Sequence, residues 1–343
     1  MKQLVLSSLV LAAACGGDGG VKSDAEFKAD VVAAMHTSIE TDLANLNAAA
    51  IELQAAAPEH AWTTADAAAI TAMKTAWRKT RIAYEHVEGA TAPIFPDFDF
   101  STDARYDDYL AELGATGDAT PFDGEGATGM HSIERILFSD EIRPEVVAFE
   151  ETLPGYRPAA FPTTDPDALA FKNGMLQRLI DDTAELHAQW QPAAIDIGAA
   201  YQGLVGLMNE QKEKVNLAAT GEEESRYANV TLFDLRNNLE GTRKVYDLFG
   251  AWIHSKDGGA NADGMIQAKL DALDALYAGT DDALPPVPVT WSSDSPTPAD
   301  LATPFGVIWA QVQVEVDPNT DGSIVFEMNE IAILLGFPEF VEE

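Results

Sequence analysis

Long stretches rich in Ala, Leu, Glu, Gln and Lys dominate the chain, and no long run of alternating polar and apolar residues occurs before its last few dozen residues. These residues have high helix propensity, whereas a half-buried strand requires the alternation that is missing. The sequence therefore predicts an all-α protein. We expect helices over 24–56, 64–89, 128–138, 167–190, 193–218, 229–254, 264–278 and 300–314.

Segments rich in proline and glycine separate these predicted helices. The longest, 92–127, 144–166 and 285–298, are expected to form irregular loops. Helices that each carry an apolar stripe must bury it against one another. We therefore expect two packed helical bundles within one domain over 25–343, with the halves divided near residue 165.

The first residues, MKQLVLSSLVLAAAC, have the form of an export signal. Lys2 provides a basic start, and the apolar stretch that follows is too short to span a bilayer as a helix. Three alanines precede Cys15, the only cysteine, in a pattern that resembles a bacterial lipobox. We expect a lipoprotein signal peptide over 1–14, lipidation of Cys15 and a flexible tether over 15–24. An ordinary cleaved signal with an incidental cysteine is the alternative.

Either type of signal exports the protein, and the lipid-anchored form is expected in the cell envelope, on its periplasmic side. An Asp directly after the lipidated cysteine commonly retains lipoproteins in an inner membrane. Here that position is Gly16, so a lipid-anchored form is expected in the outer membrane. With Cys15 lipidated, the mature fold contains no cysteine, which excludes disulfides and thiolate metal sites.

The charge balance also limits the function. The chain has 21 Lys and Arg residues against 56 Asp and Glu residues, a net charge of −35 at pH 7. A cationic face for nucleic acid is therefore not expected. The charge favours attraction of cations, although a solvated acidic surface accounts for most of it.

Residues 76–90, AWRKTRIAYEHVEGA, combine aromatic, cationic and acidic groups on one stripe of a helix. At about 100° per residue, that stripe contains Trp77, Arg81, Tyr84, Glu85 and Glu88. Glu85 and Glu88 are one turn apart, so their carboxylates can converge if a bound cation or Arg81 neutralises them. A surface network of Arg and Glu at a helix edge would give the same pattern.

A second segment, GMHSIERILF over 129–138, places His131 and Glu134 one turn apart inside an apolar helix. Helical bundles build metal sites from Glu and His one turn apart on facing helices. Gly129 at the helix start allows another backbone to approach closely. Taken alone, the pair is a weak signal, and a buried histidine satisfied by one glutamate is the commoner explanation.

Together these segments resemble the imelysin-like family of bacterial cell-envelope proteins, which includes the EfeO-type iron-uptake component. The resemblance extends over roughly 25–340, with a second signature over 221–249. It rests on Trp77, Arg81, Tyr84-Glu85, Glu88, Asp103-Ala104-Arg105 and the Gly129-x-His131-x-x-Glu134 motif.

The resemblance implies a fold of two helical bundles and a metal ion bound in a cleft between helices. The ligands carried over from the family are His131 and Glu134, with Glu85, Glu88 and Asp103 as partners. Arg81 would balance the charge of the site, and Arg105 would order the loop.

This oxygen-rich donor set points to iron, with zinc or copper as alternatives. We expect an exported lipoprotein that binds the ion for uptake or binding in the envelope, with an iron permease or another envelope protein as partner. A metal-dependent peptidase of imelysin type, with Glu85 or Glu88 as base, is the alternative, although Arg135 stands where a zinc-protease helix has its second histidine. A third hypothesis is structural: the chain is an envelope interaction module whose buried polar stripe only fixes helix register.

A different cation site is conceivable near the C-terminus. Asp317, Asn319 and Asp321 match positions 1, 3 and 5 of an EF-hand loop, but position 12 is Met328 instead of Glu. A plain turn requires no ion, so we do not expect calcium there.

Overall fold

The computed structural model describes residues 22–107, 109 and 120–340, and every regular element in these ranges is helical. The predicted all-α class is confirmed. The predicted signal peptide over 1–14, the lipidated Cys15 and most of the tether over 15–24 lie outside the described residues.

The first half of the chain forms α1 (Asp24–Ala56), η1 (Thr64–Asp66), α2 (Ala67–Glu85), α3 (Glu88–Thr91), α4 (Pro96–Asp103), α6 (Gly129–Leu137) and α7 (Pro144–Glu150). The second half forms α8 (Asp165–Ala170), the π-helical turn η2 (Phe171–Met175), α9 (Leu176–Trp190), α10 (Ile197–Leu217), α11 (Thr231–Tyr246), η3 (Asp247–Phe249), α12 (Gly250–His254), α13 (Gly259–Ala278), α14 (Pro298–Leu301), α15 (Pro304–Glu315) and α16 (Ile324–Leu335).

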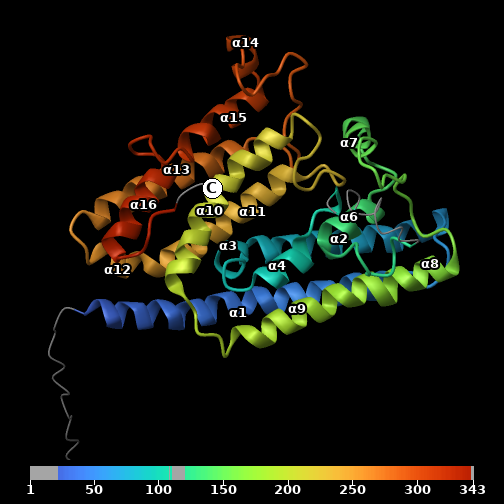
Figure 1. The fold of residues 1–343 in the computed structure, drawn as a ribbon, viewed down its shortest axis with the longest axis horizontal. Helices are drawn as coiled ribbons and strands as arrows, with labels where there is room; N and C mark the ends of the chain where they lie inside the picture. The colour runs from blue at the N-terminus through green and yellow to red at the C-terminus, as the bar shows by residue number, and fades with distance from the viewer. Residues whose placement is uncertain (1–21, 108, 110–119, 341–343) are drawn as a thin grey trace, which may run out of the picture.

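The longest helix, α1, lies side by side with α9 along one edge of the molecule (Figure 1). Ser23 caps α1 in a reciprocal capping box with Glu26, which satisfies backbone donors that the helix start would leave free. Polar side chains tie the two helices together: Asn47 Nδ2 donates to the carbonyl of Ile180 at 3.0 Å. The two helices form a base against which α2, α4, α6, α10 and α12 pack.

Two hydrophobic cores lie above this base. The α10 core joins α10, α11, α13, α15 and α16, and the α2 core joins α2, α6, η2 and the start of α9. α1 contributes Val31 and Met35 to the first core and Leu46 and Leu53 to the second. Two packed bundles are therefore present, as predicted. The division near residue 165 remains a prediction, because α1 and α9 contribute to both cores.

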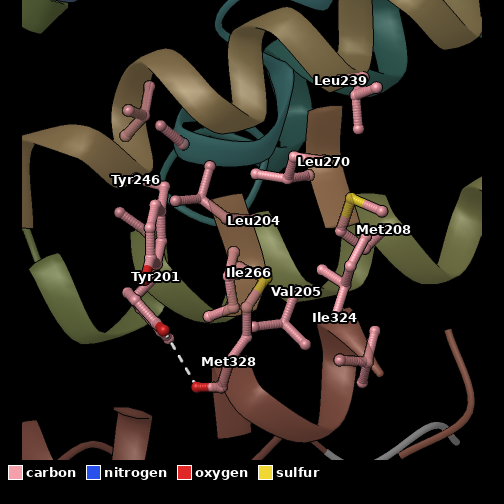
Figure 2. Close-up of a cluster of buried hydrophobic side chains, with 14 of the residues drawn as sticks. Tyr201, Leu204, Val205, Met208, Leu239, Tyr246, Ile266, Leu270, Ile324 and Met328 are labelled. Atoms are coloured by element: carbon pink, nitrogen blue, oxygen red, sulfur yellow. Dashed lines mark hydrogen bonds between the residues drawn. The ribbon is translucent and has the colours of Figure 1, made fainter. Parts of the chain in front are cut away.

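Figure 2 shows the centre of the α10 core. Leu204 and Met208 of α10 lie with Leu270 of α13 in a region that is at most 1% exposed. Within this core, the Tyr201 hydroxyl donates to the carbonyl of Met328 at 3.0 Å. Burying aliphatic side chains stabilises the fold by about 1.5–3 kcal/mol each, and this core fixes the position of α10, which also borders the site described below.

Two loop predictions were wrong. Within 144–166, residues Pro144–Glu150 form α7, which begins at Pro144. Within 92–127, residues Pro96–Asp103 form α4. Pro96 occupies the first turn, where its missing N–H has no helical partner to lose, and Asp97 and Asp99 stand at the positive end of the helix dipole. The proline starts a helix at this point, and α4 delivers Asp103 at its C-terminal end.

Two glycines allow backbones to meet near the centre of the molecule. Gly129 has φ +79°, and a Cβ there would lie 2.7 Å from the carbonyl oxygen of Thr102 in α4. A Cβ on Gly241 of α11 would lie 2.6 Å from the carbonyl oxygen of Glu85 in α2. The close approach predicted for Gly129 is therefore confirmed, and it brings α6 against the end of α4.

Replacing Gly129 with Ala is expected to lower the free energy of unfolding by about 1–3 kcal/mol, because an L-residue is strained at positive φ and its Cβ would clash with Thr102. Gly264→Ala is the matched control, since Gly264 lies in α13 with open space around it and should gain stability from the better helix former. Thermal or urea unfolding measures both variants. Equal stability of Gly129→Ala and the wild type would contradict the packing described.

Candidate metal centre

A fully buried arginine, Arg81 of α2, lies at the centre of the site. Its guanidinium forms ion pairs with Glu85 and Asp103, and it lies 3.2 Å from Glu224 and 3.3 Å from Asp234. Burial alone would lower the pKa of Arg81, but these carboxylates outweigh burial and raise it well above its usual value. The guanidinium is therefore permanently charged and compensates part of a dense group of acidic side chains.

The helices that carry this group are joined beside it. Trp77 of α2 donates its indole N–H to the carbonyl of Met130 at 3.0 Å. Arg81 lies one turn after Trp77, and His131 follows Met130, so this bond fixes α2 and α6 at the level of the site.

His131 is 3% exposed and is oriented by Glu134. Its Nδ1 lies 2.8 Å from Glu134 Oε2, while Glu134 Oε1 accepts the backbone N–H groups of Tyr227 and Ala228 at 2.9 and 2.8 Å. Both oxygens of Glu134 therefore have protein partners. A carboxylate behind a histidine fixes the ring and its tautomer, as it does behind many metal-ligating histidines.

The other ring nitrogen of His131 faces two carboxylates. Nε2 lies 3.2 Å from Glu224 Oε1 and 3.5 Å from Asp103 Oδ1. One ligand atom from each of these three residues lies within 4.8 Å of the others. Atoms that share one ion at about 2.1 Å are separated by about 3–4 Å, so the triad Asp103–His131–Glu224 needs only a small contraction to hold a metal ion.

The donor chemistry also fits a cation. Glu85 Oε2 is buried and has no hydrogen-bond donor among the described residues. An unpaired buried acceptor costs free energy, and burial raises the pKa of Glu85 well above its usual value despite Arg81. Burial likewise raises the pKa of Asp103 to about 7, with Arg81 and His131 opposing the effect. Glu85 and Asp103 are thus under-compensated, as expected where another cation is to bind. Although burial opposes it, Lys214, His131 and Arg81 lower the pKa of Glu224 well below its usual value.

A polar cavity of about 160 Å³ adjoins the triad. It is lined by Glu88, Asp103, Arg105, Glu210, Glu213, Lys214 and Glu224. Asp103 and Glu224 therefore belong both to the triad and to the cavity wall. Carboxylates outnumber cationic groups in this wall, so its field favours entry of cations.

All the residues that the sequence predicts for the metal site lie close to the triad. They differ in what each side chain contacts. Asp103 and His131 face each other, Glu134 lies behind His131, and Glu85 pairs with Arg81. Glu88 lies in the cavity wall, where its Oε2 accepts the side-chain amide of Asn238 at 2.7 Å. The role of these residues as ligands remains a prediction, and the contacts of Glu134 favour an orienting role for it.

Arg105 contacts the loop between α10 and α11. Its guanidinium donates to the carbonyl of Glu222 and lies 3.5 Å from Glu224 Oε2. These contacts agree with the predicted role in ordering a loop, because the loop delivers Glu224 to the triad.

Sequence analysis missed Glu224, Asp234 and Lys214. Glu224 lies in the run GEEES, which belongs to the second family signature, but the run offers three adjacent glutamates and no helical period to choose among them. In the structure Glu223 pairs with Arg143, and Glu224 turns toward His131. Only the course of the loop distinguishes them.

The EF-hand-like segment forms a turn that caps α16. Asp317 Oδ1 accepts the backbone N–H of Asn319 at 2.9 Å, and its Oδ2 accepts the hydroxyl of Thr320 at 2.6 Å. Ser323 then caps the helix through the N–H of Phe326. The carboxylate of Asp317 is used within the turn, in agreement with the plain turn expected from the sequence, and Asp321 is not brought to the triad.

Replacing Arg81 with Met is expected to lower the free energy of unfolding by about 3–5 kcal/mol, because it leaves buried carboxylates without their counter-charge. Arg78→Met is the matched control, one turn earlier on the same helix, where Arg78 forms a half-exposed ion pair with Asp282. That pair should contribute at most about 1 kcal/mol. Urea unfolding compares the two variants. Equal losses in the free energy of unfolding would show that the buried ion pairs of Arg81 stabilise the fold no more than the half-exposed pair of Arg78.

The metal-free protein should lose stability as the pH rises through the pKa of His131. Burial would lower this pKa, but Asp103 together with the hydrogen bonds to Glu134 and Glu224 outweighs burial and raises it from 6.5 to about 9. The stabilisation is complete below 6.5 and disappears as the pH approaches 9, a loss of up to about 3 kcal/mol. Unfolding with a chelator present measures it across that range. His131→Gln should lack this fall, and an identical pH profile in both proteins would refute the assignment.

Comparisons of this chain with a family model and with curated proteins agree on one family. The family model described as Imelysin matches residues 32–298. Proteins named Efem/EfeO family lipoprotein from Staphylococcus aureus strains MSSA476 and NCTC 8325 are 30% identical over 203 residues, which are 59% of this chain and 57% of theirs. The chain thus matches little more than half the length of these curated relatives.

A solved structure shows the same fold over nearly the whole chain. The crystal structure of an imelysin-like protein from Psychrobacter arcticum 273-4 superposes with a TM-score of 0.59 and covers 94% of this chain and 99% of its own. The two sequences are only 11% identical. This likeness therefore concerns the arrangement of helices.

Proposed function

Because the chain belongs to the imelysin family, we propose that it is a metal-binding protein of the cell envelope that binds iron at the triad Asp103–His131–Glu224. The observation that carries the proposal is the position of His131 Nε2. It faces two carboxylates beside an acidic cavity, while Nδ1 is held from behind by Glu134.

The donor set supports iron as the cargo. Two carboxylates and one imidazole suit divalent or trivalent transition metals, whereas calcium prefers a shell of oxygen atoms alone. Zinc and copper accept the same ligands, so the choice of iron rests on the resemblance to EfeO-type proteins together with this chemistry. Elemental analysis of protein isolated from its host distinguishes the three metals.

Protons and the metal ion compete for the same atom. With its pKa raised to about 9, His131 carries protons on both ring nitrogens at neutral pH. Glu134 keeps the proton on Nδ1, and a metal ion at Nε2 must displace the other proton. Arg81 compensates the carboxylates before and after this exchange, which keeps the empty and loaded forms similar in structure.

The geometry favours binding over peptide hydrolysis. The cavity beside the triad has a volume of about 160 Å³, whereas ligand clefts typically have about 300–1,000 Å³. Of the two carboxylates suggested as a general base, Glu88 accepts from Asn238, and Glu85 is fully buried, pairs with Arg81 through Oε1 and is not part of the cavity wall. We therefore propose uptake or binding of the ion without turnover.

The cellular setting completes the proposal. The name of the relatives from Staphylococcus aureus marks them as lipoproteins, which supports a cell-envelope location and an anchor on Cys15 after removal of residues 1–14. Within the described residues, none of the helices is long and apolar enough to cross a membrane. An iron permease or another envelope protein would receive the ion. None of these findings favours the outer membrane over an inner one.

The purified chain is expected to bind a single Mn²⁺, a redox-stable probe for iron, and Asp103→Asn or Glu224→Gln should weaken binding by more than about tenfold. Glu222→Gln is the matched control, since Glu222 contacts Arg105 only through its backbone carbonyl. Isothermal titration calorimetry measures the affinities. Wild-type protein that binds no Mn²⁺, or triad variants that bind as tightly as the control, would defeat the proposal.

A further inference from the structure

A second buried cation, Lys214 of α10, borders the same cavity. It is 5% exposed, and its Nζ lies 3.3 Å from Asn238 Oδ1, 3.4 Å from Glu210 Oε2 and 3.6 Å from Glu224 Oε1. The ammonium group is thus shared between one carboxylate of the triad and another on its own helix.

The oxygen that Lys214 approaches is already crowded with positive charge. Glu224 Oε1 also lies 3.2 Å from His131 Nε2 and 3.2 Å from Arg81 Nη2. A metal ion that binds Glu224 must therefore displace, or remain close to, one of three cationic groups. Like charges at such distances repel strongly in a buried site, so one group has to move.

Lys214 is the group best able to move. Arg81 is held by carboxylates from several segments, and His131 is itself in the triad. Lys214 has a flexible stem, and Glu210 lies one turn back on the same helix with its side chain 42% exposed. The ammonium can therefore leave Glu224 for Glu210 and partly regain water.

We propose that Lys214 is a displaceable internal counter-cation, which occupies the triad's side of the cavity in the metal-free protein and withdraws to Glu210 when a multivalent ion binds. Replacing the ammonium of Lys214 with Na⁺ or K⁺ leaves the charge of the site unchanged. Replacing it with a divalent or trivalent ion adds positive charge to the site. Lys214 therefore lowers the affinity for every cation and selects against monovalent ones. This inference rests on the proposed function of the same triad.

Titration of the full chain with Mn²⁺ at low and high NaCl tests the proposal. Lys214→Gln is expected to bind Mn²⁺ about tenfold more tightly than the wild type, a change of about 1.4 kcal/mol, and to lose this advantage at high NaCl as Na⁺ enters the vacated place. Lys212→Gln is the matched control: it removes the same charge from the same helix, and Lys212 interacts with the Asp317 turn, away from the cavity.

A measurement on the wild type covers the case in which Lys214→Gln does not fold. Amine acetylation followed by mass spectrometry should modify Lys214 several-fold faster with saturating Mn²⁺ than with chelator, while Lys212 is unchanged. Unaltered or slower modification of Lys214, or equal Mn²⁺ affinity of folded Lys214→Gln and Lys212→Gln, would overturn this inference alone. A wild type that binds no Mn²⁺ would overturn the proposed function as well.

Discussion

The charge of Arg81 is buried among carboxylates that arrive from four parts of the chain: Glu85 from α2, Asp103 from α4, Glu224 from the loop before α11, and Asp234 from α11 itself. Desolvating so many charges is costly unless they compensate one another. The ion pairs therefore require all four segments to be in place together. This condition ties the α2 core to the loop and helix that lead into the α10 core, and it places two carboxylates opposite His131.

The same arrangement explains why the site should accept a cation. The carboxylates exceed the fixed positive charge available to them, and Glu85 retains a buried oxygen without a donor. A protonated His131 and the mobile Lys214 supply the remaining compensation in the metal-free protein. Both can yield their place, His131 by losing a proton and Lys214 by turning its ammonium group toward Glu210. In this structure, one potential ligand atom from each of the three residues proposed to bind the ion already lies within 4.8 Å of the others.

Local sequence was sufficient for much of this structure. Helix composition and breaks predicted the main helices, and one-turn spacing placed Arg81 beside Glu85 and His131 beside Glu134, because these relations are fixed by helix geometry. It failed where the answer depends on loops and on contacts between distant segments. Residues 92–127 are predicted as an irregular loop, but Pro96 starts α4 within them. Glu224 enters the site because the loop after α10 reaches α6, where Tyr227 and Ala228 bind Glu134. Lys214 enters it because α10 packs on α3 and α11. No periodic pattern encodes these contacts.

The central claim is that Asp103, His131 and Glu224 converge on one ion. Anomalous diffraction from crystals of the protein soaked in Mn²⁺ tests it most directly, because the signal locates the metal without assumptions about its ligands. We expect one strong peak bonded to His131 Nε2 and to carboxylate oxygens of Asp103 and Glu224, with Glu134 still behind the imidazole. A peak elsewhere, for example at the Asp317 turn, with none beside His131, would contradict the account.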